Sequence, residues 1–146
     1  MSVEPGIVDA NVLAYATNAD VSYHEASRAL LNAAGDPSVR LYVTSQILCE
    51  LYSVITNPRR VAAPSSSAEA LGMISALLAL PGIVVLPSPA SAVEGWLGLL
   101  RRRPVTGGEV FDLQLVATML ANGVQRIYTF NTADFEVFNE LIVLTP

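Results

Sequence analysis

Four carboxylates are the residues of this chain whose type and surroundings could do chemistry: Asp9, Glu50, Asp112 and Asp134. Each lies in or at the end of an apolar segment, respectively IVDANVLAYA, SQILCELYSVIT, GGEVFDLQLVATML and IYTFNTADF. An unpaired carboxylate is costly to bury, so acids in such surroundings are either satisfied by partners or hold a metal ion. If the fold brings all four together, they repel one another unless a cation neutralises them. Carboxylate oxygens suit Mg²⁺ or Mn²⁺, and the four acids therefore predict metal-assisted chemistry on phosphates.

Each of these acids also has a purely structural interpretation. Asp9 could cap the helix that follows it, Asp112 could complement the dipole at the start of its helix, and Asp134 could begin a turn through an Asx bond. Glu50 has no such simple role, because its helical neighbours are largely apolar. Taken singly, the two interpretations of each acid are about equally favoured. Taken together, the four acids favour a metal site.

Three further polar residues lie close to these acids in the sequence. Asn11 could hydrogen-bond Asp9 and hold its carboxylate, or it could merely help to begin the helix; the two roles are equally favoured. Thr129 could hold a carboxylate in the same way from the end of a predicted strand. Glu109 lies at the same helix start as Asp112 and is interpreted as a capping residue.

The composition is that of one well-packed globular domain and disfavours two kinds of catalysis. Of the 146 residues, 52% are apolar and 14% are charged. The one cysteine, Cys49, is predicted to be a small core residue, and the one histidine, His24, to lie on the surface at the polar start of a helix. A catalytic thiol would need a neighbouring base, and zinc usually takes Cys and His ligands, so neither is expected.

The charge distribution restricts how the chain could bind a polyanion. Its net charge of −5 counts against simple binding to a phosphate backbone. It does not exclude a nuclease, because bound divalent ions reverse the local sign of an acidic site. The positive charge is clustered in Arg59-Arg60 and in the run Arg101–Arg103.

The apolar stretches give no sign of a membrane protein or an exported one. They are broken by Gly, Ser or Pro and are too short to span a bilayer. No basic segment precedes the first of them, as it would in a signal peptide. We therefore expect no membrane association and a cytoplasmic location.

Short apolar strands are predicted to alternate with longer helices. The strands are Gly6–Val8, Leu41–Val43, Ile83–Leu86, Arg126–Phe130 and Leu141–Leu144. The predicted helices are Asn11–Thr17, Tyr23–Ala34, Thr44 or Ser45 to about Thr56, Ala68–Leu80, a helix that ends at about Leu100, and Val110–Asn122. Ser66 and Glu69 have capping-box spacing before the fourth helix, Ser88 is predicted to cap the fifth, and Gly123 ends the sixth. Residues 101–108 are predicted to form a loop. Such alternation implies parallel strands with right-handed crossovers. We expect one α/β domain over residues 1–146, a three-layer α/β/α sandwich with a five-stranded parallel sheet.

This arrangement places the acids near one edge of the sheet. Sites in open α/β sheets form beyond the carboxyl ends of the strands, where the strand order reverses. Asp9 follows the first strand, and Asn131 and Asp134 follow the fourth. Glu50 is on the helix after the second strand, and Asp112 begins the helix that leads into the fourth. The residues converge if the first and fourth strands are neighbours, which the sequence leaves open.

The acid-bearing segments, read in order, are similar to a known family. IVDANVLAYA, SQILCELYSVITN and FDLQLVATMLANGVQRIYTFNTADF together resemble the PIN domain, and look most like the VapC toxins of type II toxin–antitoxin systems. The resemblance runs from about Gly6 to Phe135. It implies an endoribonuclease that depends on Mg²⁺ or Mn²⁺, cleaves an RNA such as tRNA or rRNA with a metal-activated water, and leaves a 3′-hydroxyl and a 5′-phosphate. It also implies a cognate antitoxin and a homodimer.

The resemblance further implies roles for the site residues. Asp9 and Asp112 would bind the metal directly, and Glu50 directly or through water. The fourth place is open between Asn131 and Asp134; charge favours Asp134, and Asn131 is kept as a ligand of the substrate or a support for the site.

The sequence also allows other functions and suggests surfaces for partner contacts. A PIN-like module that binds RNA or protein without catalysis is the main alternative, but such a module has no need of four mutually repelling acids. A phospho-acceptor receiver domain is disfavoured because the chain has no lysine. The run Arg101–Arg103 could grip RNA, bind an acidic part of the antitoxin, or be a solvated loop. Residues Glu69–Leu80, apolar on nearly every face, and Tyr23–Ala34 are predicted to contribute to dimer or antitoxin contacts.

Overall fold

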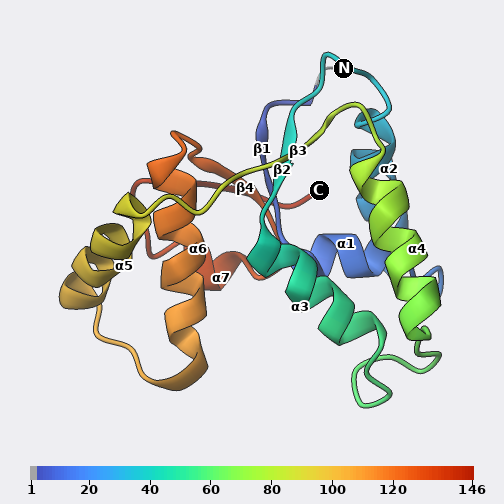
Figure 1. Cartoon of the computed structure of the whole chain (residues 1–146). Coiled ribbons are helices and arrows are strands. Elements are labelled where there is room, and N and C mark those ends of the chain that lie inside the picture. The colour runs from blue at the N-terminus through green and yellow to red at the C-terminus, as the bar shows by residue number, and fades with distance from the viewer. Residues whose placement is uncertain (1–2) are drawn as a thin grey trace.

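The computed structural model of the protein describes residues 3–146, which form one parallel sheet flanked by helices (Figure 1). The strands are β1 Gly6–Val8, β2 Leu41–Val43, β3 Ile83–Val85, β4 Arg126–Tyr128 and β5 Ile142–Leu144. All four neighbouring pairs are parallel, in the order β3-β2-β1-β4-β5. The strand order therefore reverses between β1 and β4. This confirms that the first and fourth strands are neighbours, the condition on which convergence of the acids depends.

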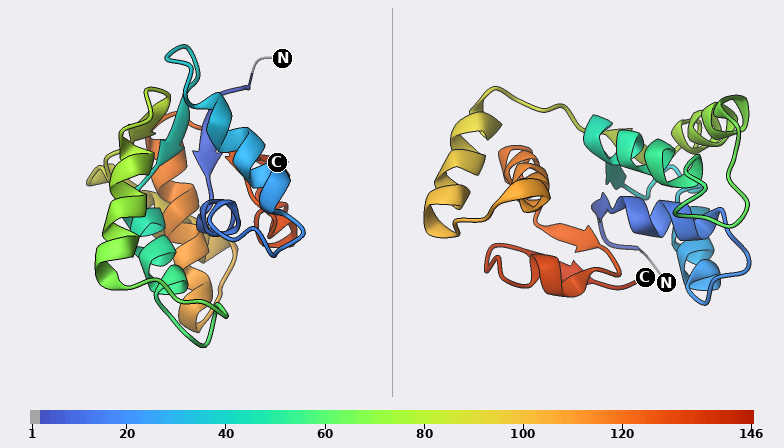
Figure 2. Two further views of the ribbon diagram at one scale, coloured as in Figure 1. Left: turned by 90° about the vertical axis from the view of Figure 1, so that its right-hand side faces the viewer. Right: turned by 90° about the horizontal axis from the view of Figure 1, so that it is seen from below.

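Helices cover both faces of the sheet, which gives the expected three layers (Figure 2). They are α1 Ala10–Ala16, α2 His24–Ala33, α3 Ser45–Ile55, α4 Ser67–Leu78, α5 Ser91–Arg102, α6 Val110–Ala121 and α7 Thr132–Phe135, with a 3-10 turn at Gly107–Glu109. The strands β1 and β2 carry almost no exposed side chains, because both of their faces are covered. The central apolar side chains of the sheet, Ile7, Leu41 and Ile127, are fully buried.

Two glycines have a defined part in this fold. Gly6 lies where β1 runs close to β4: a Cβ there would come within 2.9 Å of Cε2 of Tyr128 and 3.1 Å of the carbonyl oxygen of Arg126. Gly123 follows the end of α6 at φ +72°, a left-handed conformation that favours glycine at this position. Both keep β1, β4 and α6 in the close packing on which the acidic site depends.

The structure corrects several predicted element boundaries. Ser88 is not a helix cap: the helix α5 begins at Ser91, and its N-cap residue, Ala90, makes no side-chain capping bond. α5 also continues to Arg102, so Arg101 and Arg102 are helical rather than part of a loop. The helix α7 was not predicted, because four residues are too few to show periodicity. The capping box of Ser66 and Glu69 is confirmed.

Two predictions about single residues are also corrected. Cys49 is exposed rather than part of the core, because its side chain lies on the outer face of α3. His24 is half-buried, and its Nδ1 lies 2.9 Å from the carbonyl oxygen of Tyr15. In residues 3–146 no helix has both the length and the apolar character needed to cross a bilayer.

Candidate active site

Asp9 is fixed where the chain passes from β1 into α1. Its backbone N–H donates to the carbonyl oxygen of Tyr128 at 3.0 Å, which ties the end of β1 to β4. Its side chain is only 7% exposed. The carboxylate accepts hydrogen bonds from the N–H of Ala10 at 2.8 Å, from Nδ2 of Asn11 at 3.1 Å and from the hydroxyl of Thr129 at 2.7 Å. The structural and functional interpretations of Asp9 are thus compatible, because the residue both caps α1 and presents a buried carboxylate.

Asn11 and Thr129 hold this carboxylate together. Nδ2 of Asn11 also lies 3.2 Å from the hydroxyl oxygen of Thr129, and Oδ1 of Asn11 accepts from the N–H of Phe130 at 3.2 Å. The Thr129 oxygen accepts a further bond from the N–H of Asn131 at 3.0 Å. The hydrogen bonds expected of Asn11 and Thr129 are therefore present. They lock the ends of β1 and β4 to each other around Asp9.

Glu50 and Asp112 approach from the helices α3 and α6, and both have raised pKa values. Burial raises the pKa of Asp112 to about 6, and the charges of Asp134, Asp9 and Glu109 add to the effect. Burial likewise raises the pKa of Glu50, with contributions from Asp9 and Asp112 that Arg60 partly opposes. Burial also raises the pKa of Asp9, against the lowering by its three hydrogen bonds. Each of these acids thus senses the charge of others, which places all four in one electrostatic cluster.

Asn131 and Asp134, the two candidates for the fourth place, lie in different surroundings. Asn131 immediately precedes α7 and makes no side-chain capping bond, and it lines a pocket together with Asp9 and Glu50. Asp134, one turn further on, lines a different pocket together with Asp112. Its charge raises the pKa of both Asp9 and Asp112. Asn131 and Asp134 therefore line separate pockets, each of which also contains other acids of the cluster.

Two pockets are lined by acids of this cluster. The larger, of about 460 Å³, is lined by α1, α3 and the loops after them, with Asp9, Glu50, Asn131 and Arg60 among its walls. The smaller, of about 280 Å³, is lined by the start of α6, by α7 and by the loop before α6, with Asp112, Asp134, Glu109 and Arg103 among its walls. Asp9 and Glu50 thus line one pocket, and Asp112 and Asp134 line the other.

The oxygen atoms at this site are the ligands that a hard divalent cation prefers. The site offers carboxylate and amide oxygens. Burial first and neighbouring negative charge second raise the pKa values of Asp9, Glu50 and Asp112, and a cation would offset both effects. Within residues 3–146, no three His, Cys, Asp or Glu side chains stand close enough to share an ion without moving. Glu50 and Asp112 are tied by no side-chain hydrogen bond to another residue of this described part, so they are free to turn inward toward Asp9, which is fixed.

Three residues that line the two pockets are not predicted as site residues from the sequence: Glu109, Arg60 and Arg103. Glu109 makes no side-chain capping bond, so its predicted role is wrong, and it lines the pocket of Asp112 instead. Its spacing of three residues from Asp112, about one helical turn, could have indicated this. Arg60 and Arg103 line the two pockets, although nothing in the sequence distinguishes them from the arginines beside them. Of the run Arg101–Arg103, the structure pairs Arg102 with Glu140 at 3.0 Å.

Comparison with known proteins places these features in a family. Residues 6–141 match the PIN domain family. Ribonuclease VapC24 of Mycobacterium tuberculosis is 30% identical over 140 residues, which cover 95% of this chain and 94% of VapC24. Ribonuclease VapC43 of the same species is 30% identical over 115 residues, which cover 79% of this chain and 78% of VapC43.

Solved structures show a similar fold. The crystal structure of VapC20 from Mycobacterium tuberculosis, described as a toxin that cleaves the sarcin-ricin loop, aligns with a TM-score of 0.70 at 18% identity and covers 96% of this chain and 98% of VapC20. VapBC2 from Rickettsia felis, bound to a promoter DNA fragment, aligns with a TM-score of 0.66 at 16% identity and covers 98% of this chain and 99% of the aligned chain.

Proposed function

The chain belongs to the PIN-domain family, with VapC ribonucleases as its relatives, and on that premise we propose that it is the endoribonuclease toxin of a type II toxin–antitoxin system. It would hydrolyse RNA phosphodiester bonds with the help of Mg²⁺ or Mn²⁺. The observation that carries this proposal is the meeting of four acids from four separate segments at the carboxyl ends of β1 and β4. Without a cation, repulsion between the four carboxylates would only destabilise the folded protein.

The proposal assigns a part to each acid. Asp9 and Asp112 would bind the ion directly, Glu50 would bind it directly or through water, and Asp134 would complete the negative set. A bound divalent ion lowers the pKa of its water and stabilises negative charge on the phosphate. The hydrogen bonds from Thr129 and Asn11 keep the Asp9 carboxylate in one orientation. Asn131 faces the larger pocket, where its amide can contact the substrate.

The proposed reaction needs no nucleophilic side chain, because a water attacks the phosphate. An acid of the set that does not bind the ion directly can orient this water or accept its proton. Asp112, as a direct ligand, would be held in its ionised form by the ion. The one histidine, His24, has its Nδ1 on the carbonyl oxygen of Tyr15, and the one cysteine, Cys49, is exposed, so no Cys–His pair is proposed as nucleophile.

RNA cleavage tests this function directly. Purified protein is incubated with total tRNA or rRNA in Mn²⁺ and in EDTA, next to Asp9→Asn and a control, Glu94→Gln, which alters an exposed acid on α5. We expect cleavage by the wild-type and Glu94→Gln proteins in Mn²⁺ alone. Cleavage that survives both EDTA and Asp9→Asn would exclude the proposed mechanism. Retention of RNA without any cleavage would instead favour the non-catalytic binding module.

We further propose that an antitoxin binds an apolar groove on the side of the molecule formed by α1, α2, α3 and α4. The groove has a volume of about 410 Å³, and its walls include Leu13, Leu31, Leu51, Met73 and Leu77. The helix α4 also leaves Leu71 64% exposed. Both of the helices predicted to make such contacts, α2 and α4, line this groove.

Substitution in this groove separates neutralisation from catalysis. Met73→Glu puts a charge into the groove and should weaken capture by the co-expressed antitoxin while RNA cleavage stays unchanged, because none of the four acids lines this groove. Full neutralisation of Met73→Glu would contradict this site. The homodimer also stays a proposal, tested by gel filtration of the toxin alone at about micromolar concentration.

A further inference from the structure

We propose that Arg60 and Arg103 bind the RNA phosphates on the two sides of the acidic cluster, whereas their neighbours Arg59 and Arg101 do not. This inference rests on the proposed ribonuclease function and adds to it the residues that hold the substrate strand. It starts from a physical difficulty: a chain of net charge −5, with its acids gathered at the site, must bind a polyanion. A divalent ion offsets the acids, but the flanking phosphates still need positive partners.

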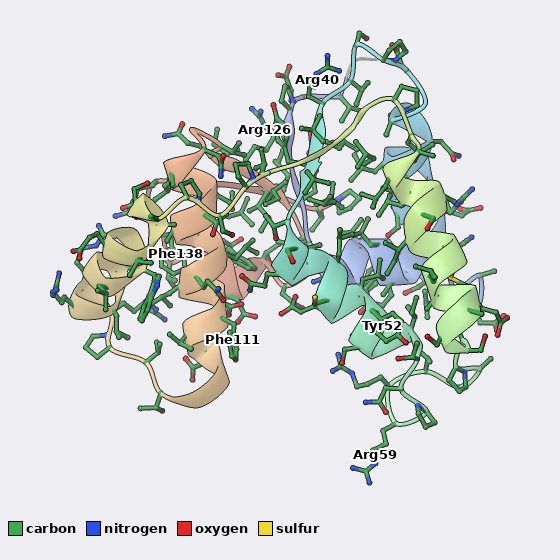
Figure 3. The ribbon with its side chains drawn as sticks, in the orientation of Figure 1. Arg40, Tyr52, Arg59, Phe111, Arg126 and Phe138 are labelled. Atoms are coloured by element: carbon green, nitrogen blue, oxygen red, sulfur yellow. The ribbon has the colours of Figure 1, made fainter. Side chains whose placement is uncertain are left out.

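Arg60 lies on one side of the cluster, in the larger pocket with Asp9, Glu50 and Asn131. Its backbone is fixed in the loop after α3, where its N–H donates to the carbonyl oxygen of Asn57 at 2.9 Å. Its charge reaches Glu50 and opposes the rise in the pKa of that acid. In contrast, the side chain of Arg59 extends from the tip of the same loop into solvent (Figure 3). Two adjacent arginines therefore have different surroundings, and Arg60 alone of the two faces the site.

Arg103 lies on the opposite side, in the smaller pocket with Asp112, Asp134 and Glu109. It ends α5, immediately before the loop that leads into α6. The two other members of the run are differently placed: Arg102 is paired with Glu140, and Arg101 is exposed in the last turn of α5. The loops that carry Arg60 and Arg103 lie on opposite sides of α7 in two perpendicular views (Figures 1 and 2).

Both guanidinium groups are free to bind a ligand. Among residues 3–146, side-chain hydrogen bonds from arginine are made by Arg40, Arg102 and Arg126. The only ion pair in that part of the chain is that of Arg102. A guanidinium presents its donors in a fork that matches two phosphate oxygens. Because each arginine shares a pocket with the acids, the observations favour the substrate backbone over an acidic partner protein as its ligand.

The test compares each arginine with its neighbour. Arg60→Ala, Arg103→Ala, Arg59→Ala and Arg101→Ala remove the same charge, so a difference within a pair reports position and not net charge. The probe is a short fluorescein-labelled single-stranded RNA. Its cleavage in Mn²⁺ gives kcat and KM, and its binding is measured across a range of KCl concentrations in the Asp9→Asn background. Mn²⁺ affinity is measured by calorimetry on every variant as a second, activity-independent readout.

We expect Arg60→Ala and Arg103→Ala each to weaken RNA binding about tenfold, the effect of losing a hydrogen bond to a charged group. Each should also lower the slope of log K against log salt by about 0.7, the value for one phosphate of a single strand. Arg59→Ala and Arg101→Ala should match the wild type. Arg60→Lys keeps the charge but not the fork, so it should restore the salt dependence and only part of the binding. No variant should weaken Mn²⁺ binding, because the acids are intact.

The possible results distinguish failure of the arginine proposal from failure of the proposed ribonuclease function. If the wild type cleaves RNA but Arg60→Ala and Arg103→Ala behave like their neighbours, the arginine pair is refuted and the ribonuclease stands. The same holds if only neutralisation by the antitoxin changes, since the arginines would then serve a protein partner. If the wild type cleaves no RNA, the proposed function fails and the arginine pair fails with it.

Discussion

The two halves of the acidic cluster are built differently. Asp9, at the end of β1, is buried and held by three hydrogen bonds from Ala10, Asn11 and Thr129. Glu50 and Asp112, on α3 and α6, are more exposed and have no such hydrogen bonds within residues 3–146. The sheet thus supplies one fixed carboxylate, whereas the helices supply adjustable ones. A cation can be received by such a site because only one ligand needs to be in place beforehand.

Removal of the acids should have the largest effect. Asp9→Asn and Asp112→Asn each take away a proposed direct ligand and with it several kcal/mol of transition-state stabilisation. We expect RNA cleavage to fall by about a thousandfold or more, on the rule of tenfold for each 1.36 kcal/mol. Single-turnover cleavage in Mn²⁺ measures this. If both variants keep near-wild-type rates, neither half of the cluster is part of the reaction.

Loss of the support around Asp9 should have an intermediate effect. Thr129→Val removes the hydroxyl and leaves Oδ2 of Asp9 and the N–H of Asn131 each without one partner. We expect Mn²⁺ affinity to fall by about 10- to 100-fold, and stability by roughly 1–3 kcal/mol.

The matched control for this change is Thr129→Ser, which keeps the hydroxyl and should restore Mn²⁺ binding. Calorimetric titration with Mn²⁺ and chemical unfolding give the two readouts. Equal Mn²⁺ affinity in Thr129→Val and the wild type would show that Asp9 needs no fixed orientation.

The raised pKa of Asp112, on the helical side of the cluster, should make the stability of the protein depend on pH. The folded-state pKa of Asp112, about 6, lies above its ordinary value of 3.8, so the folded protein binds this proton more tightly than the unfolded chain. The metal-free protein should therefore lose stability as pH rises from about 4 to about 6. Mn²⁺ binding should strengthen over the upper part of that range, because Asp112 must release its proton to bind.

Thermal melting with and without Mn²⁺ across this pH range measures both effects. In Asp112→Asn the pH dependence should shrink, and its metal-free Tm near neutral pH should be a few degrees above that of the wild type. A wild-type Tm that rises with pH in the absence of metal would contradict the raised pKa of Asp112.

The difference between the halves also explains which features could be predicted from sequence. Asp9 was found from its place after an apolar strand, and its supports Asn11 and Thr129 from their closeness to strand ends. The five strands and the parallel sheet followed from periodicity, since covered strands are continuous apolar runs. The adjacency of β1 and β4 could not be predicted, because it is a contact between segments more than a hundred residues apart.

The features that sequence reasoning missed depend on side-chain direction. Arg60 and Arg59 are identical in type and adjacent in sequence, and only the folded loop separates the one at the site from the one in solvent. The position of Glu109 at a helix start predicts a cap, because capping and pocket-lining acids share that position. Cys49 was placed in the core because its sequence neighbours are apolar, although a helix turns successive residues to different faces.

A crystal grown in MnCl₂ tests the central claim most directly. The anomalous difference map should show a manganese peak between β1 and α6, coordinated by Asp9 and Asp112, with Glu50 turned toward it. Full occupancy of that position would establish that the scattered acids act as one site. A map without a peak there, with the helical acids apart from Asp9, would contradict it.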